Sequence, residues 1–446
     1  MWLAAIRCVN IFKNSICWKT PLRRYLWVSS KSLIDRAASE GELRVFIVAG
    51  EVSGDSIASR LMASLNKISP LPIRFSGVGG SRMSNQGLKS LFPMENIART
   101  VEAALQFQPH VVVMVDSKGL SFRLLKQLRG GEARLKGLSK FVDYVFCILP
   151  NEEAGCKLNG LNATFVGHPI LEDVLELNMG KETALHEWKI TGNGEDFRKK
   201  YAIASDNKLL LFISFCVHVY ICLLICSVYG STVITLPPGS RLQEVTRMLP
   251  IFSNTMKLLK DSLPELVTVI HVAPNQLVDN YIAKAVHKWP VPAILIPGGT
   301  PQLKYDAFNA SLVALCTSGT VAMELQLARL PCLVTYRAHF LTEWFVRHKA
   351  KIPYISLPNI LLDSPVIPEA LFQACTPAKV AFLLKELMNN TVLQQQQIAA
   401  AEKVMELLCP PNRTLNNTEQ QGMKPSPPSY SPSMIAASTI LSYKQR

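Results

Sequence analysis

The chain alternates between short apolar, β-branched runs and longer stretches with helical spacing, and this alternation restricts the fold more than any other feature. Strand-like runs cover 44–50, 73–78 and 111–115, and amphipathic stretches lie at 55–65 and 101–107. Strands that alternate with helices at this cadence are typical of an open parallel sheet with helices on its faces. The sequence therefore predicts an α/β fold.

The same cadence occurs twice, on either side of a divide near residues 175–231. A chain of 446 residues has room for two ordinary domains and tails. Further strand-like runs after the divide lie at 233–236, 267–272, 293–296, 311–315 and 333–336. The expected organisation is an N-terminal domain over 41–175, a linker over 176–231, a C-terminal domain over 232–408 and a tail over 409–446.

Residues 209–229 break this pattern, because they form a 21-residue apolar run with one His and no charged residue. A run of this length can span a bilayer as a helix. Its position argues against a span, since it lies between the two halves and directly precedes a core strand. We interpret 208–230 as an apolar insert in the linker, and a membrane-tethered protein stays the alternative.

The first 34 residues carry six basic residues and no acidic one, with apolar residues between the charges. This pattern is typical of an organellar transit peptide, whereas a secretory signal has one uninterrupted apolar core. The segment is not especially rich in Ser and Thr, which favours a mitochondrion over a plastid. We expect a transit peptide over 1–40, with a disordered basic tail as the alternative.

The formal net charge of +14 is only partly explained by this leader, so a basic surface is also expected. Such a surface suits anionic lipid or phosphate-bearing substrates. No basic stretch is interleaved with aromatic residues, so we expect no nucleic-acid partner. The eleven cysteines are scattered and odd in number, which favours free thiols in a reducing compartment over disulfides or a structural zinc.

A glycine-containing turn after the first strand is a candidate binding site. Gly50, Ser53, Gly54 and Asp55 lie where the strand ends and a helix begins. Glycines permit a tight turn there, and a helix N-terminus presents unpaired N–H groups to an anion or a polar sugar. The alternative is an ordinary strand–helix turn in which Asp55 interacts favourably with the helix dipole.

A second turn of this kind contains Gly239, Ser240 and Arg241, between a strand and a helix of the second half. The Arg241 guanidinium can bind two oxygens of a diphosphate at once, and so neutralise its negative charge.

A third turn contains Ser318, Gly319 and Thr320, with Glu324 one helical turn further on. Small hydroxyls and a glycine at a helix N-terminus cradle phosphate oxygens, and the carboxylate can hold ribose hydroxyls. The alternative is a helix that Ser318 or Thr320 merely caps.

Asp116 directly follows the strand-like run 111–115. Functional groups in open α/β sheets gather beyond the carboxyl ends of the strands. A carboxylate there can take the proton from an attacking sugar hydroxyl. A loop cap is the alternative for a single Asp.

These motifs occur in an order that resembles the lipid-A-disaccharide synthase family, from about residue 43 to about residue 385. The most specific part of the match is the set GVGGSRM, FVGHP, PGSR-x-x-EV and YISLPN. The other matching segments are AGEVSGD, CILPNEE and TSGTVAMELQLARLPCLVTYR.

The resemblance implies a GT-B fold, in which two Rossmann-like domains face a cleft, the first for the acceptor and the second for the UDP-sugar. Family members are inverting glycosyltransferases that need no metal or other cofactor. They join 2,3-diacylglucosamine from UDP to 2,3-diacylglucosamine 1-phosphate through a β-1,6 bond and release UDP. The partners implied are UDP-diacylglucosamine, diacylglucosamine phosphate and, by peripheral contact, membrane lipid, with a homodimer as a further expectation.

The resemblance also assigns roles to particular residues. Asp116 lies in the family's strand-end motif and is implied as the base for the acceptor 6-hydroxyl, and Arg241 is implied at the UDP. His168 in the Gly-His-Pro turn is a candidate to face the cleft, with a hydrogen-bonded structural His as the alternative. The donor-site residues carried over are Ser318, Gly319, Thr320 and Glu324, with Tyr336, Arg337 and Asn359 as weaker candidates.

The chain departs from the family in three places. A segment is missing after Ala98, a strand with its loop is missing after Arg129, and the insert 208–230 is added. Loss of a core strand should leave a gap in the first sheet, with unpaired backbone beside it. We therefore expect the family's activity, weakened in this chain. The alternatives are an inactive or membrane-tethered variant, and another UDP-sugar enzyme on the same fold.

Overall fold

The computed structural model contains two compact units. The first comprises Met1–Asp173 and Leu408–Arg446, and the second comprises Val174–Leu407. The boundary after Asp173 lies close to the divide expected from the sequence. The structure describes residues 2–8, 32–50, 52–90, 97–115, 142–177, 188–204, 208–213, 223–228, 231–337, 343, 353–410 and 431–444.

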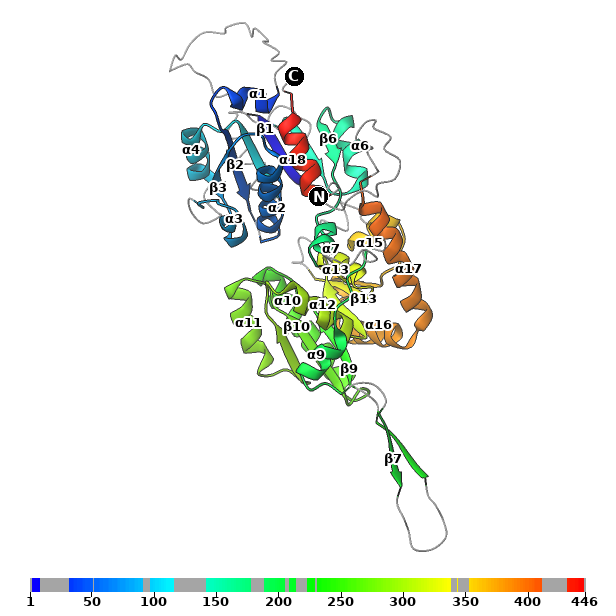
Figure 1. Cartoon of the computed structure of the whole chain (residues 1–446). Coiled ribbons are helices and arrows are strands. Elements are labelled where there is room, and N and C mark those ends of the chain that lie inside the picture. The colour runs from blue at the N-terminus through cyan, green and yellow to red at the C-terminus, as the bar shows by residue number, and fades with distance from the viewer. Residues whose placement is uncertain are drawn as a thin grey trace, which may run out of the picture. The chain divides into compact units, whose positions relative to one another are not determined.

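Among its described residues, the first unit contains a six-stranded sheet with the order β3-β2-β4-β1-β5-β6 (Figure 1). Strand β2 is parallel to β3 and to β4, and β5 is parallel to β6. The bounds are β1 Trp2–Cys8, β2 Leu43–Ala49, β3 Ile73–Val78, β4 Val111–Val115, β5 Tyr144–Cys147 and β6 Asn162–Phe165. Every residue of β4 is buried, as its β-branched run predicts for a central parallel strand.

Strand β1 is antiparallel to both of its neighbours, β4 and β5. Cys8 pairs with Val111 on one side, and Ile6 pairs with Tyr144 on the other. The gap expected in the first sheet is therefore not found at this place, because residues 2–8 occupy it. The physical reason is that two facing strand edges carry unpaired N–H and C=O groups, which an extended segment satisfies.

Helices cover both faces of this sheet. Because side chains alternate along a strand, neighbouring residues of β2 contact helices on opposite faces. Val45 and Ile47 pack with α2 and α18 on one face, while Phe46 and Val48 pack with α4 on the other. The bounds are α1 Leu33–Ala38, α2 Val52–Ile68, α3 Ser81–Asn85, α4 Ile97–Phe107, α6 Pro150–Leu158, α7 Leu171–Leu177 and α18 Pro432–Ser442.

The C-terminal helix α18 is part of the first unit. It packs along α2, and the hydroxyls of Ser64 and Ser433 are hydrogen-bonded at 2.8 Å. Ala437 and Ile440 are fully buried in the core that they share with α2. Within the expected tail, helix α18 is thus packed back onto the N-terminal domain.

In the described part of the second unit, six strands form a wholly parallel sheet with the order β11-β10-β9-β12-β13-β14. Their bounds are β9 Thr232–Leu236, β10 Leu266–His271, β11 Ala293–Ile296, β12 Val313–Thr317, β13 Cys332–Tyr336 and β14 Glu369–Leu371. The helices are α9 Gly194–Lys200, α10 Leu242–Lys260, α11 Gln276–Val286, α12 Pro301–Ala310, α13 Val321–Leu327, α15 Leu357–Leu362, α16 Pro377–Asn389 and α17 Thr391–Leu408. Both units therefore have the Rossmann-like α/β architecture expected from the sequence.

The apolar insert does not form the membrane-spanning helix that the sequence left open. Its described residues form strands β7 Lys208–Ile213 and β8 Leu223–Val228, which pair antiparallel as a separate two-stranded sheet. Across the residues that the structure describes, no helix has the length and apolar character needed to cross a membrane.

Candidate functional site

Two of the predicted turns meet at one edge of the second sheet. Strands β9 and β12 are hydrogen-bonded neighbours, so the turns that follow them lie side by side at the carboxyl edge. The N–H of Thr317 at the end of β12 donates to the carbonyl of Pro237 at the end of β9, at 3.4 Å. In open α/β sheets this edge is where ligands bind.

Each of these turns contains a glycine in the left-handed backbone region. Gly239 has φ of +113° and Gly319 has φ of +145°, conformations that other residues adopt only with strain. Gly239 is also restricted by space, because a Cβ there would lie 2.4 Å from Glu244 Oε2. At Gly319 no atom lies within 4 Å of such a Cβ, so only the backbone conformation requires glycine.

Arg241 is the N-cap residue of α10 and is exposed, as is Ser240 beside it. A guanidinium has the chemistry to bind a diphosphate, and this role of Arg241 stays a prediction.

Glu244, which the sequence analysis did not single out, lies under the same turn. Burial raises the pKa of its carboxyl, while hydrogen bonds from the Thr317 side chain and from the N–H groups of Ser240 and Arg241, with the Arg241 charge, act in the opposite direction. A Glu three residues after an N-cap is the acid of a capping box, so the spacing from Arg241 contained a signal for this contact.

The β12 turn presents its residues to solvent. Gly319 and Thr320 are exposed, and Ser318 is half-buried. Thr320 is the N-cap residue of α13, but its side chain makes no capping hydrogen bond. Capping by Thr320, the alternative left open by the sequence, is thus not what the structure has.

Glu324 on α13 forms an ion pair with Lys304 on α12, with 2.7 Å between Nζ and Oε1. Of the weaker candidates, Tyr336 is the last residue of β13 and Arg337 directly follows it. Tyr336 is half-buried against Phe372, and the exposed Arg337 donates to the carbonyl of Cys375 at 3.4 Å.

Asn359 has a structural role. It is fully buried, and its amide donates to the carbonyl of Ile367 and to Glu369 and accepts the N–H of Ile367. Its hydrogen-bonding capacity is therefore largely used inside the protein, and we leave it out of the proposed site.

In the first unit, Gly50 and the exposed Ser53 lie at the carboxyl edge of the sheet, where β2 leads into α2, and Gly54 is buried. Asp55 is 6% exposed and accepts three backbone N–H groups, from Gly80, Arg82 and Met83. This carboxylate fixes the start of α3, which neither reading of the sequence anticipated.

His168 is buried and neutral. Burial lowers the pKa of its imidazole to about 4. Its Nδ1 accepts the N–H of Ile170 at 3.2 Å, so the neutral ring carries its proton on Nε2. These contacts support the structural alternative for His168.

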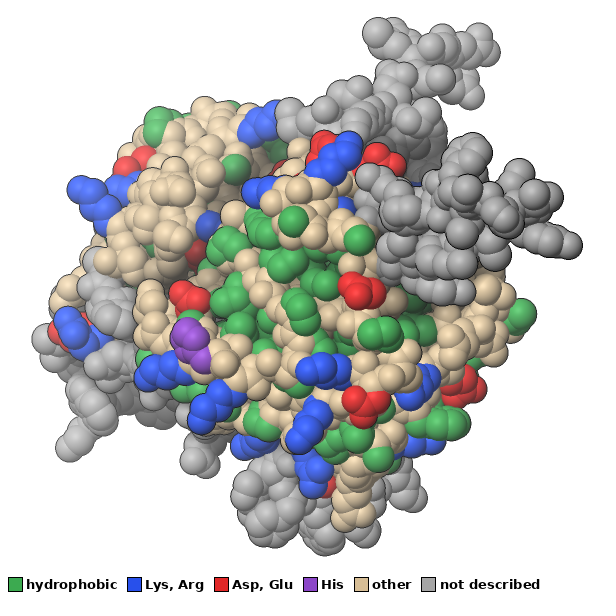
Figure 2. All heavy atoms as spheres, turned by 90° about the horizontal axis from the view of Figure 1, so that it is seen from below, with side chains coloured by type: hydrophobic (Ala, Val, Ile, Leu, Met, Phe, Trp, Pro, Cys, Tyr) green, Lys and Arg blue, Asp and Glu red, His purple; other side chains and the backbone are tan. Residues whose placement is uncertain are grey.

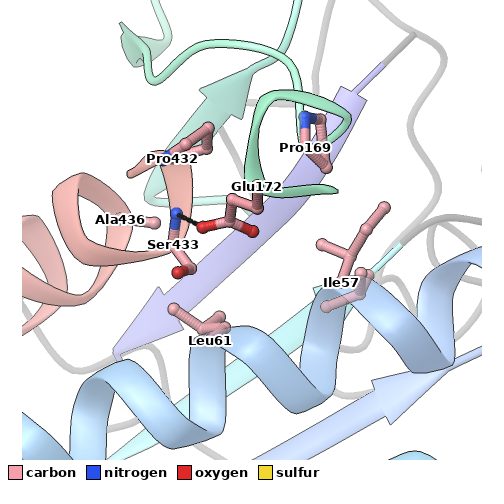
Figure 3. A pocket seen from close by; sticks show the side chains of 8 residues that line it. Ile57, Leu61, Pro169, Glu172, Pro432, Ser433 and Ala436 are labelled. Atoms are coloured by element: carbon pink, nitrogen blue, oxygen red, sulfur yellow. Dashed lines mark hydrogen bonds between the residues drawn. The ribbon is translucent and has the colours of Figure 1, made fainter. Parts of the chain in front are cut away.

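Asp116 lies outside the described residues, directly after β4. The last residue of β4, Val115, lines a small cavity at the carboxyl edge of the first sheet, shown in Figure 3. Its volume open to water is about 10 Å³, enough for roughly one molecule. Glu172 on α7 faces this cavity and accepts the N–H of Ser433 at 2.9 Å.

No group of three or more His, Cys, Asp or Glu residues that could hold a metal occurs among the described residues. Cys147, Cys156, Cys316, Cys332 and Cys375 are free and buried, and Cys409 is free and half-buried. This agrees with the free thiols predicted from their spacing.

Comparison with known proteins gives one family. A family model described as lipid-A-disaccharide synthetase matches residues 45–136 and 229–421. A curated Arabidopsis thaliana protein, named probable lipid-A-disaccharide synthase, mitochondrial, is 53% identical over 464 aligned residues, which cover 94% of this chain and 95% of that protein. The aligned length exceeds the 446 residues of the chain, so the relative has positions that this chain lacks. This agrees with the expectation that the chain lacks family segments after Ala98 and after Arg129.

Two further proteins extend the comparison. The lipid-A-disaccharide synthase of Rhodospirillum centenum is 35% identical over 412 residues, covering 83% of this chain and 92% of the relative. The S. aureus MnaA–UDP structure superimposes with a TM-score of 0.52 at 12% identity, covering 81% of this chain and 92% of the other. At that identity the likeness shows the fold alone.

Proposed function

The chain belongs to the lipid-A-disaccharide synthase family of glycosyltransferases, and we propose that it forms the β-1,6-linked disaccharide 1-phosphate of lipid A biosynthesis. The donor is UDP-2,3-diacylglucosamine and the acceptor is 2,3-diacylglucosamine 1-phosphate. The acceptor 6-hydroxyl attacks the anomeric carbon, the bond to the UDP oxygen breaks on the opposite face, and the hydroxyl proton passes to a base. Attack and departure on opposite faces invert the anomeric configuration.

The observation that carries this proposal is the meeting of the β9 and β12 turns. Arg241 is exposed on one turn, and Gly319 and Thr320 are exposed on the other. As the donor bond breaks, negative charge develops on the diphosphate. A guanidinium and helix N-termini aimed at that charge stabilise the transition state. These groups supply positive charge without a metal ion, so we propose a reaction that needs no metal or cofactor.

Asp116 is the proposed base. In the sequence it directly follows Val115, the last residue of β4, and groups that act on substrate gather beyond the carboxyl ends of strands in this kind of fold. A carboxylate within hydrogen-bond reach of the acceptor 6-hydroxyl can accept its proton as the new bond forms.

For the location we propose the mitochondrion, with peripheral contact to a membrane. The name of the Arabidopsis relative includes that organelle, and the first 34 residues have the basic, acid-free composition of a transit peptide. On the face seen in Figure 2, basic side chains lie among apolar and acidic ones, and basic side chains attract anionic lipid. The homodimer stays a prediction.

A transfer assay with purified, acylated substrates tests the proposal. Arg241→Ala should lower kcat/KM by about 10²-fold or more, and Asp116→Ala by about 10²- to 10⁴-fold. Lys257→Ala, an exposed cation on the last turn of α10, is the control and should behave as the wild type.

Two outcomes contradict the proposal. A folded preparation that shows no heat of binding with UDP in calorimetry rules out a UDP-sugar donor. Transfer that is equally fast with donors lacking acyl chains points to another UDP-sugar enzyme on the same fold.

A further inference from the structure

His271 is a buried polar residue at the carboxyl edge of the second sheet. It is the last residue of β10, whose neighbours in the sheet are β9 and β11, and it is 9% exposed. Its Nε2 lies 2.6 Å from the hydroxyl oxygen of Thr235 on β9, which is fully buried. Its ring packs against Phe308 of α12, with 4.9 Å between the ring centroids. One side chain thus contacts both a strand and a helix of the second unit.

These two contacts lead to two parts of the candidate donor site. Thr235 is the last residue but one of β9, so it lies next to the start of the β9 turn. Phe308 lies one helical turn after Lys304 on α12, and Lys304 forms the ion pair with Glu324. His271 therefore connects the strand that carries the β9 turn with the helix that holds the partner of Glu324.

The stability of the fold does not explain a histidine at this place. Among the residues that the structure describes, the Nδ1 of His271 is buried and has no hydrogen-bond partner. Leaving a polar atom unpaired inside a protein typically costs at least as much as one neutral hydrogen bond contributes. Burial, together with the charge of Lys304, lowers the pKa of the imidazole to about 3, so the ring is neutral at physiological pH. An apolar ring of the same shape would avoid the cost of the unpaired nitrogen.

We propose that His271 is a positioning residue for donor binding, which fixes the spacing between β9 and α12 and so the spacing between the β9 turn and Glu324. The inference rests on the proposed function, in which the β9 turn binds the diphosphate of the donor and Glu324 binds its ribose. Diphosphate and ribose are joined covalently, so one UDP molecule makes both contacts only if these two parts of the protein are correctly spaced.

Two single variants and their combination isolate the contact. His271→Phe keeps a flat ring of similar size but removes both nitrogens, and Thr235→Val removes the hydroxyl from the other side. Each should raise the Kd of UDP about tenfold, measured by calorimetry with the full chain. The double variant should bind UDP as weakly as either single variant, because all three break the same contact. Its Tm should be close to that of the wild type, since apolar groups of similar shape replace both polar partners.

Trp289→Phe is the matched control. The Nε1–H of Trp289 donates to the hydroxyl of Thr268 at 2.9 Å, and Thr268 lies on the same strand as His271, three residues before the carboxyl edge. This variant therefore also breaks a hydrogen bond between a ring nitrogen and a threonine, but away from the candidate site. It should lower Tm by a few degrees and leave the Kd of UDP unchanged.

Uridine separates positioning from direct contact, because it has the ribose without the diphosphate. Ligand-observed NMR should give the same Kd of uridine for the wild type and for His271→Phe, while UDP binds the variant more weakly. An equal loss of affinity for uridine and for UDP would overturn the positioning role.

The outcomes separate the two proposals. If the wild type does not bind UDP, the proposed function fails, and the positioning role fails with it. If the wild type binds UDP and both single variants bind it equally well, only the positioning role is overturned. The same holds if Trp289→Phe weakens UDP binding as much as His271→Phe does. Should His271→Phe not fold, Thr235→Val decides.

Discussion

Lys304 Nζ on α12 lies 2.7 Å from Glu324 Oε1 on α13, and the two side chains are only 25% and 21% exposed. The carboxylate expected to hold ribose hydroxyls thus has a cation that fixes its orientation. We expect Glu324→Gln to raise the KM for the UDP-sugar about tenfold with little change in kcat, because a ribose contact is made equally in the ground and transition states. Steady-state kinetics at varied donor concentration measure both.

Lys304→Met is the companion variant. It leaves the Glu324 carboxylate in place, so its effect on KM should be smaller than that of Glu324→Gln. If both variants lower Tm and neither changes KM, the pair has a purely structural role.

Asp55→Asn separates structure from substrate binding in the first unit. The side chain accepts N–H groups from Gly80, Arg82 and Met83, and an amide can satisfy fewer of them. We expect a loss of about 1–3 kcal/mol in the free energy of unfolding, measured in urea. UDP binding should be unchanged, since Asp55 belongs to the other unit; weaker UDP binding would contradict this.

Glu172 should make stability depend on pH. Burial raises the pKa of its carboxyl above the ordinary 4.5, against the hydrogen bonds of Ser433 and the charge of Arg60. The folded state then holds a proton that the unfolded chain releases. The stability from this group is fully present below pH 4.5 and is lost as pH rises through the raised folded pKa.

Urea unfolding at a series of pH values tests this. Glu172→Gln cannot titrate, so the difference in unfolding free energy between it and the wild type should change with pH across that window. A difference that stays constant means that Glu172 has its ordinary pKa in the folded protein.

Ile6→Pro tests the place of β1 in the first sheet. This residue is paired with Val113 on one side and Tyr144 on the other, so proline removes a hydrogen-bond donor inside the sheet. We expect a loss of about 3 kcal/mol in the free energy of unfolding and faster amide exchange in β4. Ile6→Val should behave as the wild type. Equal stability of all three proteins would exclude β1 from the sheet.

Local pattern predicted most of the fold. The run 293–296 coincides with β11, and 73–78 coincides with β3, because apolar β-branched residues end at turn residues on both sides. Strand β12 was expected two residues early, at 311–315 rather than Val313–Thr317, since Ser311 and Leu312 belong to the connection after α12.

The candidate site was only partly predictable. The turns after β9 and β12 were predicted because their glycines and Arg241 stand out in the sequence between a strand-like run and a helical one. The hydrogen bonds of Asp55 and Asn359 inside the protein were not predicted, because the groups that bind them are fixed by tertiary packing. Asp55 binds the N–H of Gly80, 25 residues further along, and no spacing rule covers such a contact. Glu244 has a local signature as well, because it lies three residues after Arg241, the spacing at which a carboxylate reaches back to an N-cap N–H.

The position of β1 inside the first sheet matters for any cleavage of the N-terminus. A peptide that is cleaved off on import into an organelle cannot also be a strand of the mature protein's sheet. If residues 2–8 were removed, the edges of β4 and β5 that pair with β1 would have unpaired N–H and C=O groups. An extended segment from a second molecule could then pair with both strands. If the proposed transit peptide is removed, the site of cleavage would then decide whether the protein stays monomeric or exchanges strands with a second copy.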